Sequence, residues 1–267
     1  MLKDITLGQY FPGDTLVHKL DPRTKLILTM VYLIALFTAN SLLTLGMVAL
    51  FLILVIGVSK VKVRQMMKGL RPLIFILTIT GMLNIFITPG EPIFTIWRIT
   101  ATWEGLTRSV ILVARIVMMV MGTFILTYTT TPMALTDGLE RLMRPLKRIR
   151  VPVHELTLIM STALRFIPTL IEETDKIMSA QKARGADFET GNLVKRAKAL
   201  LPLLVPLFMS AFRRAAELAD AMESRCYHDG EGRTRLRQLK FERRDVLTCL
   251  VGALLLAVII SLVVMGL

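Results

Sequence analysis

The sequence predicts an all-α membrane protein, with about five transmembrane helices and a helical cytoplasmic domain in which two long helices end in arginine. Three observations lead to this fold class. The chain is 54% hydrophobic, above the roughly 45–50% typical of soluble domains. Residues 26–58 and 246–267 contain no charged side chain. The formal net charge of +13 is concentrated between such runs, which favours a membrane protein over a nucleic-acid-binding one.

The first uncharged run is too long for a single membrane crossing. Residues 26–58 would measure about 50 Å as one helix at 1.5 Å per residue, whereas one crossing needs only about 20 residues. The polar pair Asn40–Ser41 lies near the middle of the run. We therefore expect two short spans joined by a tight turn at this pair.

Three further spans are expected along the chain. The third runs from about residue 70 to 88, with Pro72 near its start, where a missing N–H is harmless. The fourth runs from about residue 106 to 130, and the fifth from about 246 to 266. Between the third and fourth spans, residues 92–103 alternate β-branched and aromatic side chains, which predicts a short hairpin.

The charges in the connections predict the orientation of the spans. Basic residues fill the connection between the second and third spans and follow the fourth: Lys60, Lys62, Arg64, Lys68, Arg71, Arg141, Arg144, Lys147, Arg148 and Arg150. The positive-inside rule therefore places the N-terminus and residues 131–245 in the cytoplasm and the C-terminus outside the cell. The expected division is a membrane domain at 1–130, a cytoplasmic domain at 131–245 and the last span at 246–267.

Two apolar segments of the cytoplasmic domain resemble spans but carry the wrong charges. Residues 156–171 contain Arg165 and Pro168, and residues 199–212 contain two prolines. Both segments have basic residues on each flank, whereas a span should show an asymmetry of charge. We expect helices at the membrane surface or facing a core rather than membrane crossings.

The sequence offers no catalytic residue, cofactor site or metal site. It contains neither the P-loop pattern GxxxxGK[ST] nor a nucleophile elbow. The histidines His18, His154 and His228 are scattered and form no metal-binding pattern with cysteine. Cys249 lies in the last apolar run and Cys226 in a basic loop, so no disulfide is expected between them. The expected protein is not an enzyme.

One arginine falls inside a predicted span. Arg115 lies about nine residues into the fourth span, and an intramembrane arginine is rare enough to be a functional hypothesis. A structural alternative is that it extends toward the outer headgroups or pairs with Glu91 or Glu104. We favour the structural alternative, because the spans contain no other residue typical of a polar pathway.

The segment LDPRTK at residues 20–25 precedes the first span. Asp21 is expected to cap the first helix, with Pro22 at its first position. Arg23 and Lys25 would then lie at the cytoplasmic headgroups. We favour this structural interpretation of the segment.

Two similar motifs, QKARGAD at 181–187 and MESRCYH at 222–228, place an arginine between small residues at the end of a charged helix. Helical spacing puts four residues on one face of each helix: Glu173, Ile177, Ala180 and Arg184, and Arg214, Leu218, Ala221 and Arg225. Such a face suits a helix docked in a groove of a partner. The alternative is a helix terminus with Gly185 in the left-handed conformation. Cys226 terminates helices less well than glycine, so capping explains the second motif less well.

Three segments together resemble the transmembrane (T) component of energy-coupling factor transporters. These are GQYFPGDTLVHKLDPRTK at residues 8–25, QKARGAD, and AMESRCYHDGEGRTR from residue 221. The resemblance covers nearly the whole chain. It implies a multi-pass protein of a prokaryotic cell membrane that assembles with two ABC-type ATPase subunits and a membrane-embedded, substrate-binding S component. It also implies that two triplets dock on the ATPases, one arginine on each: Ala183, Arg184 and Gly185, and Ser224, Arg225 and Cys226.

The expected function is that of a non-catalytic scaffold and coupling subunit of an ATP-driven importer of vitamins or micronutrients. A stand-alone secondary transporter and a membrane anchor without transport coupling are alternatives. The nearly charge-free spans and the paired motifs favour the subunit. The expected surroundings are the lipid bilayer and the protein partners, with no nucleic acid.

Overall fold

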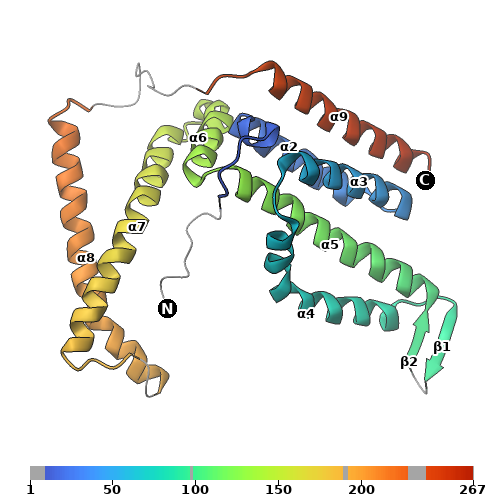
Figure 1. Ribbon diagram of the computed structural model, residues 1–267, viewed down its shortest axis with the longest axis horizontal. Helices are drawn as coiled ribbons and strands as arrows, with labels where there is room; N and C mark the ends of the chain where they lie inside the picture. Colours follow the sequence, from blue (N-terminus) through green and yellow to red (C-terminus); the bar gives the residue numbers. More distant parts are fainter. Residues whose placement is uncertain (1–9, 97–98, 189–191, 228–238, 267) are drawn as a thin grey trace. The chain divides into compact units, whose positions relative to one another are not determined.

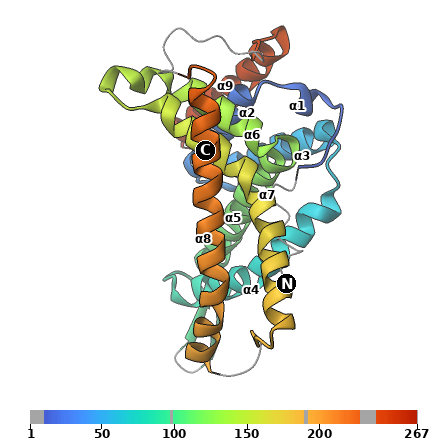
Figure 2. The ribbon, with the colours of Figure 1, turned by 90° about the vertical axis from the view of Figure 1, so that its left-hand side faces the viewer.

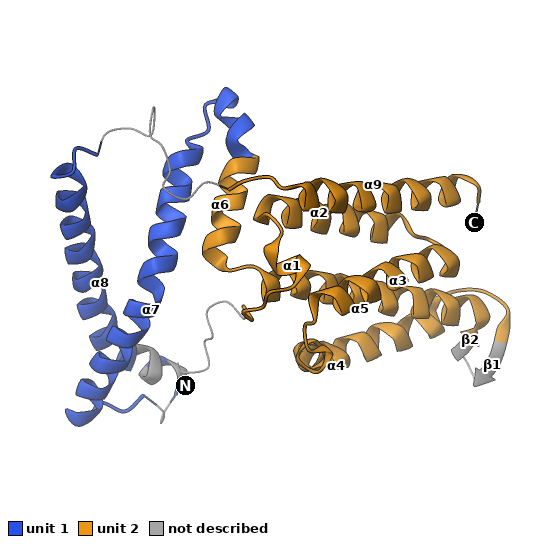
Figure 3. Cartoon of the chain, turned by 45° about the horizontal axis from the view of Figure 1, so that its top comes forward, with its two compact units in different colours: residues 1–7, 143–238 blue, residues 8–142, 239–267 orange. Residues whose placement is uncertain are grey.

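The computed structural model describes residues 10–96, 99–188, 192–227 and 239–266. These residues form helices, one two-stranded hairpin and the connecting turns (Figure 1). The chain divides into two compact units (Figure 3). Unit 1 consists of residues 1–7 and 143–238, and unit 2 of residues 8–142 and 239–267.

Unit 2 contains the N-terminal helices, the hairpin and the C-terminal helix. Its elements are α1 (Leu16–Lys19), α2 (Pro22–Thr38), α3 (Leu42–Ser59), α4 (Val63–Ile87), β1 (Pro92–Ile96), β2 (Ile99–Thr102), α5 (Trp103–Thr129) and α9 (Arg243–Val264). The helix α6 (Pro132–Met143) ends at the boundary between the units. Unit 1 continues with a 3-10 turn, η2 (Arg144–Ile149), and two long helices, α7 (Val153–Ala183) and α8 (Leu193–Glu223).

Five helices in the described part of the chain are long and apolar enough to cross a membrane. Four of them, α3, α4, α5 and α9, coincide with expected spans, and the predicted all-α membrane fold is confirmed. The fifth is residues 198–223 of α8, which we expected at the membrane surface. The expected first span, α2, has 17 residues and measures about 26 Å, slightly less than the roughly 30 Å hydrocarbon core.

The position of α8 relative to the membrane stays a prediction, because length and composition alone place it among these five helices. Its last third carries charged side chains: Arg213, Arg214, Glu217, Asp220 and Glu223. A crossing that included this part of the helix would bury charges in hydrocarbon, which is costly. We therefore keep the expectation that α8 is not a span.

The first two helices and the turn between them agree with the prediction. α2 ends at Thr38 and α3 begins at Leu42, and Ser41 caps α3. In this capping box the Thr44 N–H donates to Ser41 Oγ at 3.2 Å, and the Ser41 N–H donates to Thr44 Oγ1 at 3.1 Å. The two reciprocal bonds satisfy donors that the start of a helix leaves unpaired.

The third span differs from the prediction at its start. α4 begins at Val63, so Pro72 lies inside the helix and not near its first turn. A proline within a helix removes one backbone hydrogen bond and bends the axis. α4 bends partway along its length (Figure 1). Arg64 and Lys68 are therefore part of a helix, whereas Lys60 and Lys62 lie in the turn before it, which composition did not indicate.

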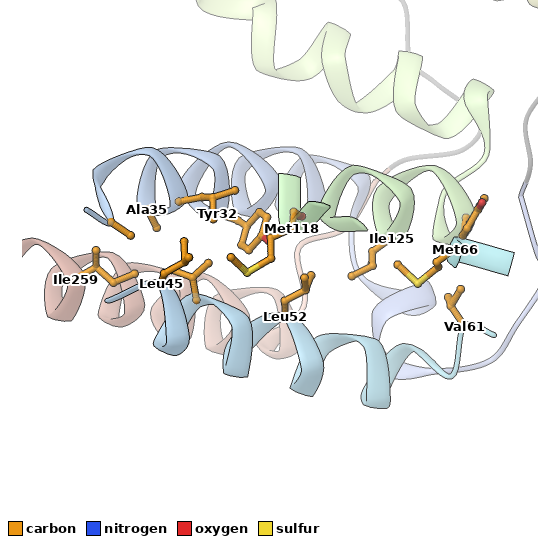
Figure 4. Packing of buried hydrophobic residues seen from close by; sticks show 13 residues of the cluster. Tyr32, Ala35, Leu45, Leu52, Val61, Met66, Met118, Ile125 and Ile259 are labelled. Atoms are coloured by element: carbon orange, nitrogen blue, oxygen red, sulfur yellow. The ribbon is translucent and has the colours of Figure 1, made fainter. Parts of the chain in front are cut away.

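The core of unit 2 lies between α2, α3, α5 and α9 (Figure 4). Tyr32 reaches from α2 to α5, where its hydroxyl donates to the Met118 carbonyl at 2.9 Å. Gly122 permits this approach, because a Cβ there would lie 2.4 Å from the Tyr32 ring. Small residues at such contacts allow membrane helices to pack closely.

The predicted hairpin between the third and fourth spans is confirmed. β1 and β2 pair antiparallel, with Ile96 opposite Ile99, and the register shifts between Pro92 and Phe94. Thr102 then caps α5 by accepting from the Gly105 N–H at 3.1 Å. The hairpin thus leads directly into the fourth span.

The segment LDPRTK forms a buried polar cluster. Asp21 caps α2 as predicted, accepting from the Arg23 N–H at 2.9 Å, and the Asp21 N–H donates to Asp245 of α9 at 2.8 Å. Lys25, however, is 6% exposed and does not lie at the headgroups as predicted. Its ammonium donates to the Thr129 carbonyl at 2.9 Å. The last carbonyls of a helix have no partner within the helix and attract a cation, which explains this inward position.

Candidate functional site

The candidate site lies on the long helices of unit 1. α7 and α8 each contain 31 residues and pack against each other. α8 runs back along α7 in the opposite direction, so the C-terminal ends of the two helices point away from each other (Figure 1). The view in Figure 2 shows the same two helices side by side. Each end carries one of the predicted motifs.

The first motif terminates α7. Ala183 is the last helical residue, Arg184 follows as the cap, and Gly185 has a left-handed backbone with φ of +86°. The Ala186 N–H donates to the Gln181 carbonyl at 3.0 Å, and the Gly185 N–H donates to Lys182 at 3.0 Å. This is the Schellman arrangement, which satisfies the last carbonyls of a helix.

The second motif terminates α8 in the same way. Ser224 follows the last helical residue, and Cys226 has a left-handed backbone with φ of +53°. The Tyr227 N–H donates to the Met222 carbonyl at 2.9 Å. This bond spans five residues, as does the bond from Ala186 to Gln181. Both helices therefore end in the same backbone turn, although at the second motif a residue with a Cβ takes the left-handed position.

Both arginines are presented to the outside of unit 1. All six predicted site residues are exposed: Ala183, Arg184, Gly185, Ser224, Arg225 and Cys226. Neither guanidinium of Arg184 or Arg225 forms an ion pair or a side-chain hydrogen bond with the described part of the chain. A guanidinium has five N–H donors, which suit the planar recognition of a carboxylate. The two motifs can thus each supply a complete fork of donors to a partner.

The two predicted helix faces meet each other near their starts. Arg214 Nη2 of α8 donates to Glu173 Oε2 of α7 at 2.9 Å. The face of α7 is half-buried at Glu173 and Ile177 and exposed further along, and the face of α8 changes in the same way. The start of each face is therefore used between the helices, and only its end is available to a partner.

Sequence reasoning missed this contact, because it assigned Glu173 and Arg214 to faces that dock in a groove of a partner. The Glu173 pKa is held below its ordinary value, first by a side-chain hydrogen bond from Ser210 and then by Arg214. The spacing of these residues from the two motifs could have indicated the contact. Glu173 precedes Arg184 by 11 residues, and Arg214 precedes Arg225 by 11 residues (184 − 173 and 225 − 214).

Arg115 is held by backbone rather than by a carboxylate. Its Nη2 donates to the Ala39 carbonyl and, at 3.5 Å, to Asn40 Oδ1. Glu104, one predicted partner, instead accepts from the Glu91 N–H at 2.8 Å. Arg115 thus caps the C-terminal end of α2 at the turn to α3. This agrees with the structural alternative, although the partners differ from the expected ones.

Known proteins match the chain over nearly its whole length. The family model described as cobalt transport protein, CbiQ, matches residues 13–236. The energy-coupling factor transporter transmembrane protein EcfT of Thermosediminibacter oceani is 50% identical over 254 residues, which cover 95% of this chain and 96% of the relative. EcfT of Ruminiclostridium cellulolyticum is 50% identical over 247 residues, 92% of each chain. EcfT of Bacillus subtilis is 47% identical over 267 residues, 100% of this chain and 97% of the relative.

Proposed function

The chain belongs to the CbiQ family and is a transmembrane component of an energy-coupling factor transporter, and on this basis we propose that it couples ATP hydrolysis in partner subunits to substrate uptake. Two ABC-type ATPase subunits dock on the ends of α7 and α8, Arg184 on one subunit and Arg225 on the other. A membrane-embedded S component binds the vitamin or micronutrient. The chain itself catalyses no reaction.

The observation that carries this proposal is the pair of matching helix ends. Both arginines directly precede a left-handed residue, both are exposed, and they lie at opposite ends of the α7–α8 pair (Figure 3). A single helix end of this kind would be an ordinary cap. Two equivalent ends that point apart suit two equivalent partners, which supports one ATPase on each.

Exposed apolar side chains on α7 and α8 suit a second contact. They include Leu156, Ile159, Met160, Leu200, Leu201, Leu204, Val205, Phe208, Met209 and Phe212. A surface with this many large apolar side chains exposed is typical of a protein or membrane interaction site. In our proposal it contacts the S component and the cytoplasmic face of the bilayer. Movement of the helix ends is then transmitted to the S component, which releases its substrate to the cytoplasm.

Such coupling has a thermodynamic requirement. A partner shifts a conformational equilibrium only if it binds the two states with different free energies. The ATPase pair must therefore bind the arginine ends differently when it is open and when it is closed. Two contacts that are far apart can report this difference, because closure changes the distance between the partner grooves.

Alanine substitution of the arginines tests the proposal in the whole transporter. Removal of one partner from a buried ion pair typically costs about 2–5 kcal/mol, which is a loss of about 30-fold or more in affinity. We expect Arg184→Ala or Arg225→Ala to weaken co-purification of the ATPases or to uncouple ATP hydrolysis from uptake. The double variant should lose the ATPases altogether, while the S component still binds its substrate.

Two further variants sharpen the experiment. Arg213→Ala removes an exposed arginine of α8 outside the motifs and should leave the ATPases bound. Lysine at position 184 or 225 should restore binding only in part, because it keeps the charge but lacks the planar fork. Full retention of the ATPases and of uptake in the double alanine variant would contradict the coupling role. A membrane anchor without transport coupling would give that result.

A further inference from the structure

The contact between α7 and α8 includes a half-buried ion pair. Arg214 Nη2 lies 2.9 Å from Glu173 Oε2, and the side chains are 32% and 24% exposed. Ser210, one helical turn before Arg214, also lowers the pKa of the same carboxylate. Arg214 Nε is buried, and no described atom accepts a hydrogen bond from it. The Nε edge of the guanidinium is thus covered, while the side chain as a whole stays partly exposed.

The ion pair lies equally far from both arginine ends along the helices. Glu173 precedes Arg184 by 11 residues, and Arg214 precedes Arg225 by 11 residues (184 − 173 and 225 − 214). At 1.5 Å per residue each arm is about 16 Å long. Because α7 and α8 run in opposite directions, the two arms extend away from the ion pair on opposite sides (Figure 1).

We propose that Glu173 and Arg214 are positioning residues for coupling: their ion pair is the fulcrum that sets the angle between α7 and α8 and hence the spacing of Arg184 and Arg225. This inference rests on the proposed coupling function. In the proposed mechanism, neither Glu173 nor Arg214 contacts an ATPase subunit or the S component. Both act through the arginine ends, which the fulcrum holds in one relative arrangement.

The length of the two arms makes the distance between Arg184 and Arg225 sensitive to the angle between the helices at the ion pair. With arms of about 16 Å, a rotation of about 10° at the ion pair displaces each end by about 3 Å. A displacement of this size exceeds the tolerance of a charge-assisted hydrogen bond, whose donor and acceptor lie about 2.7–2.9 Å apart. Two helices without a fixed angle would each dock one ATPase subunit. They would not transmit the closure of the two ATPase subunits to the rest of the transporter.

The first test measures the arrangement of the helices in the full-length chain alone, reconstituted in lipid nanodiscs. Spin labels at Ala180 and Ala221 report the angle, because both positions are exposed and each lies seven residues beyond the ion pair (180 − 173 and 221 − 214). Cys226 and Cys249 are replaced by serine to make the labels specific. We expect one narrow distance distribution in the parent protein, and a shifted or broader one in Glu173→Gln.

Matched variants separate the ion pair from general effects of charge. Glu172→Gln removes the neighbouring carboxylate, which is exposed, and should leave the distribution unchanged. The exchange of charges, Glu173→Arg with Arg214→Glu, should restore a narrow distribution that neither single change shows. An unchanged distribution in both Glu173→Gln and Arg214→Gln would overturn the fulcrum.

The second test measures coupling in the assembled transporter. We expect Glu173→Gln to retain both ATPases while the substrate imported per ATP hydrolysed falls, and the charge exchange to recover this ratio. An unchanged ratio in Glu173→Gln would also overturn the fulcrum. The double alanine variant at 184 and 225 reports separately on the proposed function, because it should lose the ATPases, whereas the fulcrum variants should retain them.

Discussion

Arg184 and Arg225 end their helices through the same backbone turn, although different residues make it. Gly185 and Cys226 both have positive φ, and each directly follows the arginine. A residue with a Cβ loses roughly 1–2 kcal/mol in this conformation, whereas glycine does not. The second helix end is therefore strained at Cys226, and the first is not.

Substitutions at Gly185 and Cys226 test whether the left-handed backbone conformation is strained. Cys226→Gly should stabilise the last turn of α8 by about 1 kcal/mol, which slows amide hydrogen exchange there about fivefold. Gly185→Ala should speed exchange in the last turn of α7, because the space around Gly185 is open and only the backbone conformation opposes a Cβ. Mass spectrometry of exchange at residues 180–186 and 221–227 measures both effects. Equal exchange rates in parent and variants would contradict the strain.

Arg115 acts at the scale of elements, because it joins α5 to the turn between α2 and α3. Its hydrogen bond to the Ala39 carbonyl satisfies a buried acceptor at the end of α2. Loss of a hydrogen bond from a charged donor costs about 1–3 kcal/mol. We expect Arg115→Gln to lower the thermal stability of the detergent-solubilised protein, while uptake per assembled transporter stays near normal.

A matched control is available in the same helix. Arg108 lies one heptad earlier on α5 and is exposed, so Arg108→Gln should change neither stability nor uptake. Normal assembly with defective transport in Arg115→Gln would show that this arginine has a direct role in transport.

At the scale of the whole molecule, the distribution of charge predicts on which side of the membrane the two motifs lie. Basic residues flank the described helices of unit 1 on both sides, so residues 131–245 are expected in the cytoplasm. Single cysteines at positions 184 and 225, in a chain without its native cysteines, should not react in intact cells with a reagent that cannot cross the membrane. They should react after permeabilisation. Labelling at either position in intact cells would overturn the orientation and, with it, a cytoplasmic ATPase contact.

The local elements of this protein could be predicted from the sequence. These are the turn at Asn40–Ser41, the cap at Asp21, the hairpin after the third span and the two helix ends that carry an arginine. Each depends on residues within a few positions of one another, on caps, turn residues and the length of apolar runs. The family was also identified from three short segments, and the match to CbiQ and EcfT proteins confirms it.

Only the tertiary structure decided which distant residues meet. It placed Lys25 against the end of α5, Arg115 against the end of α2, and Glu173 against Arg214. These partners are separated by 104, 76 and 41 residues, and no local pattern specifies such pairs. A charged side chain takes whichever unpaired carbonyl or carboxylate the packing of helices brings to it. Composition alone therefore predicted charges at the membrane surface, whereas packing placed Lys25 within the protein interior.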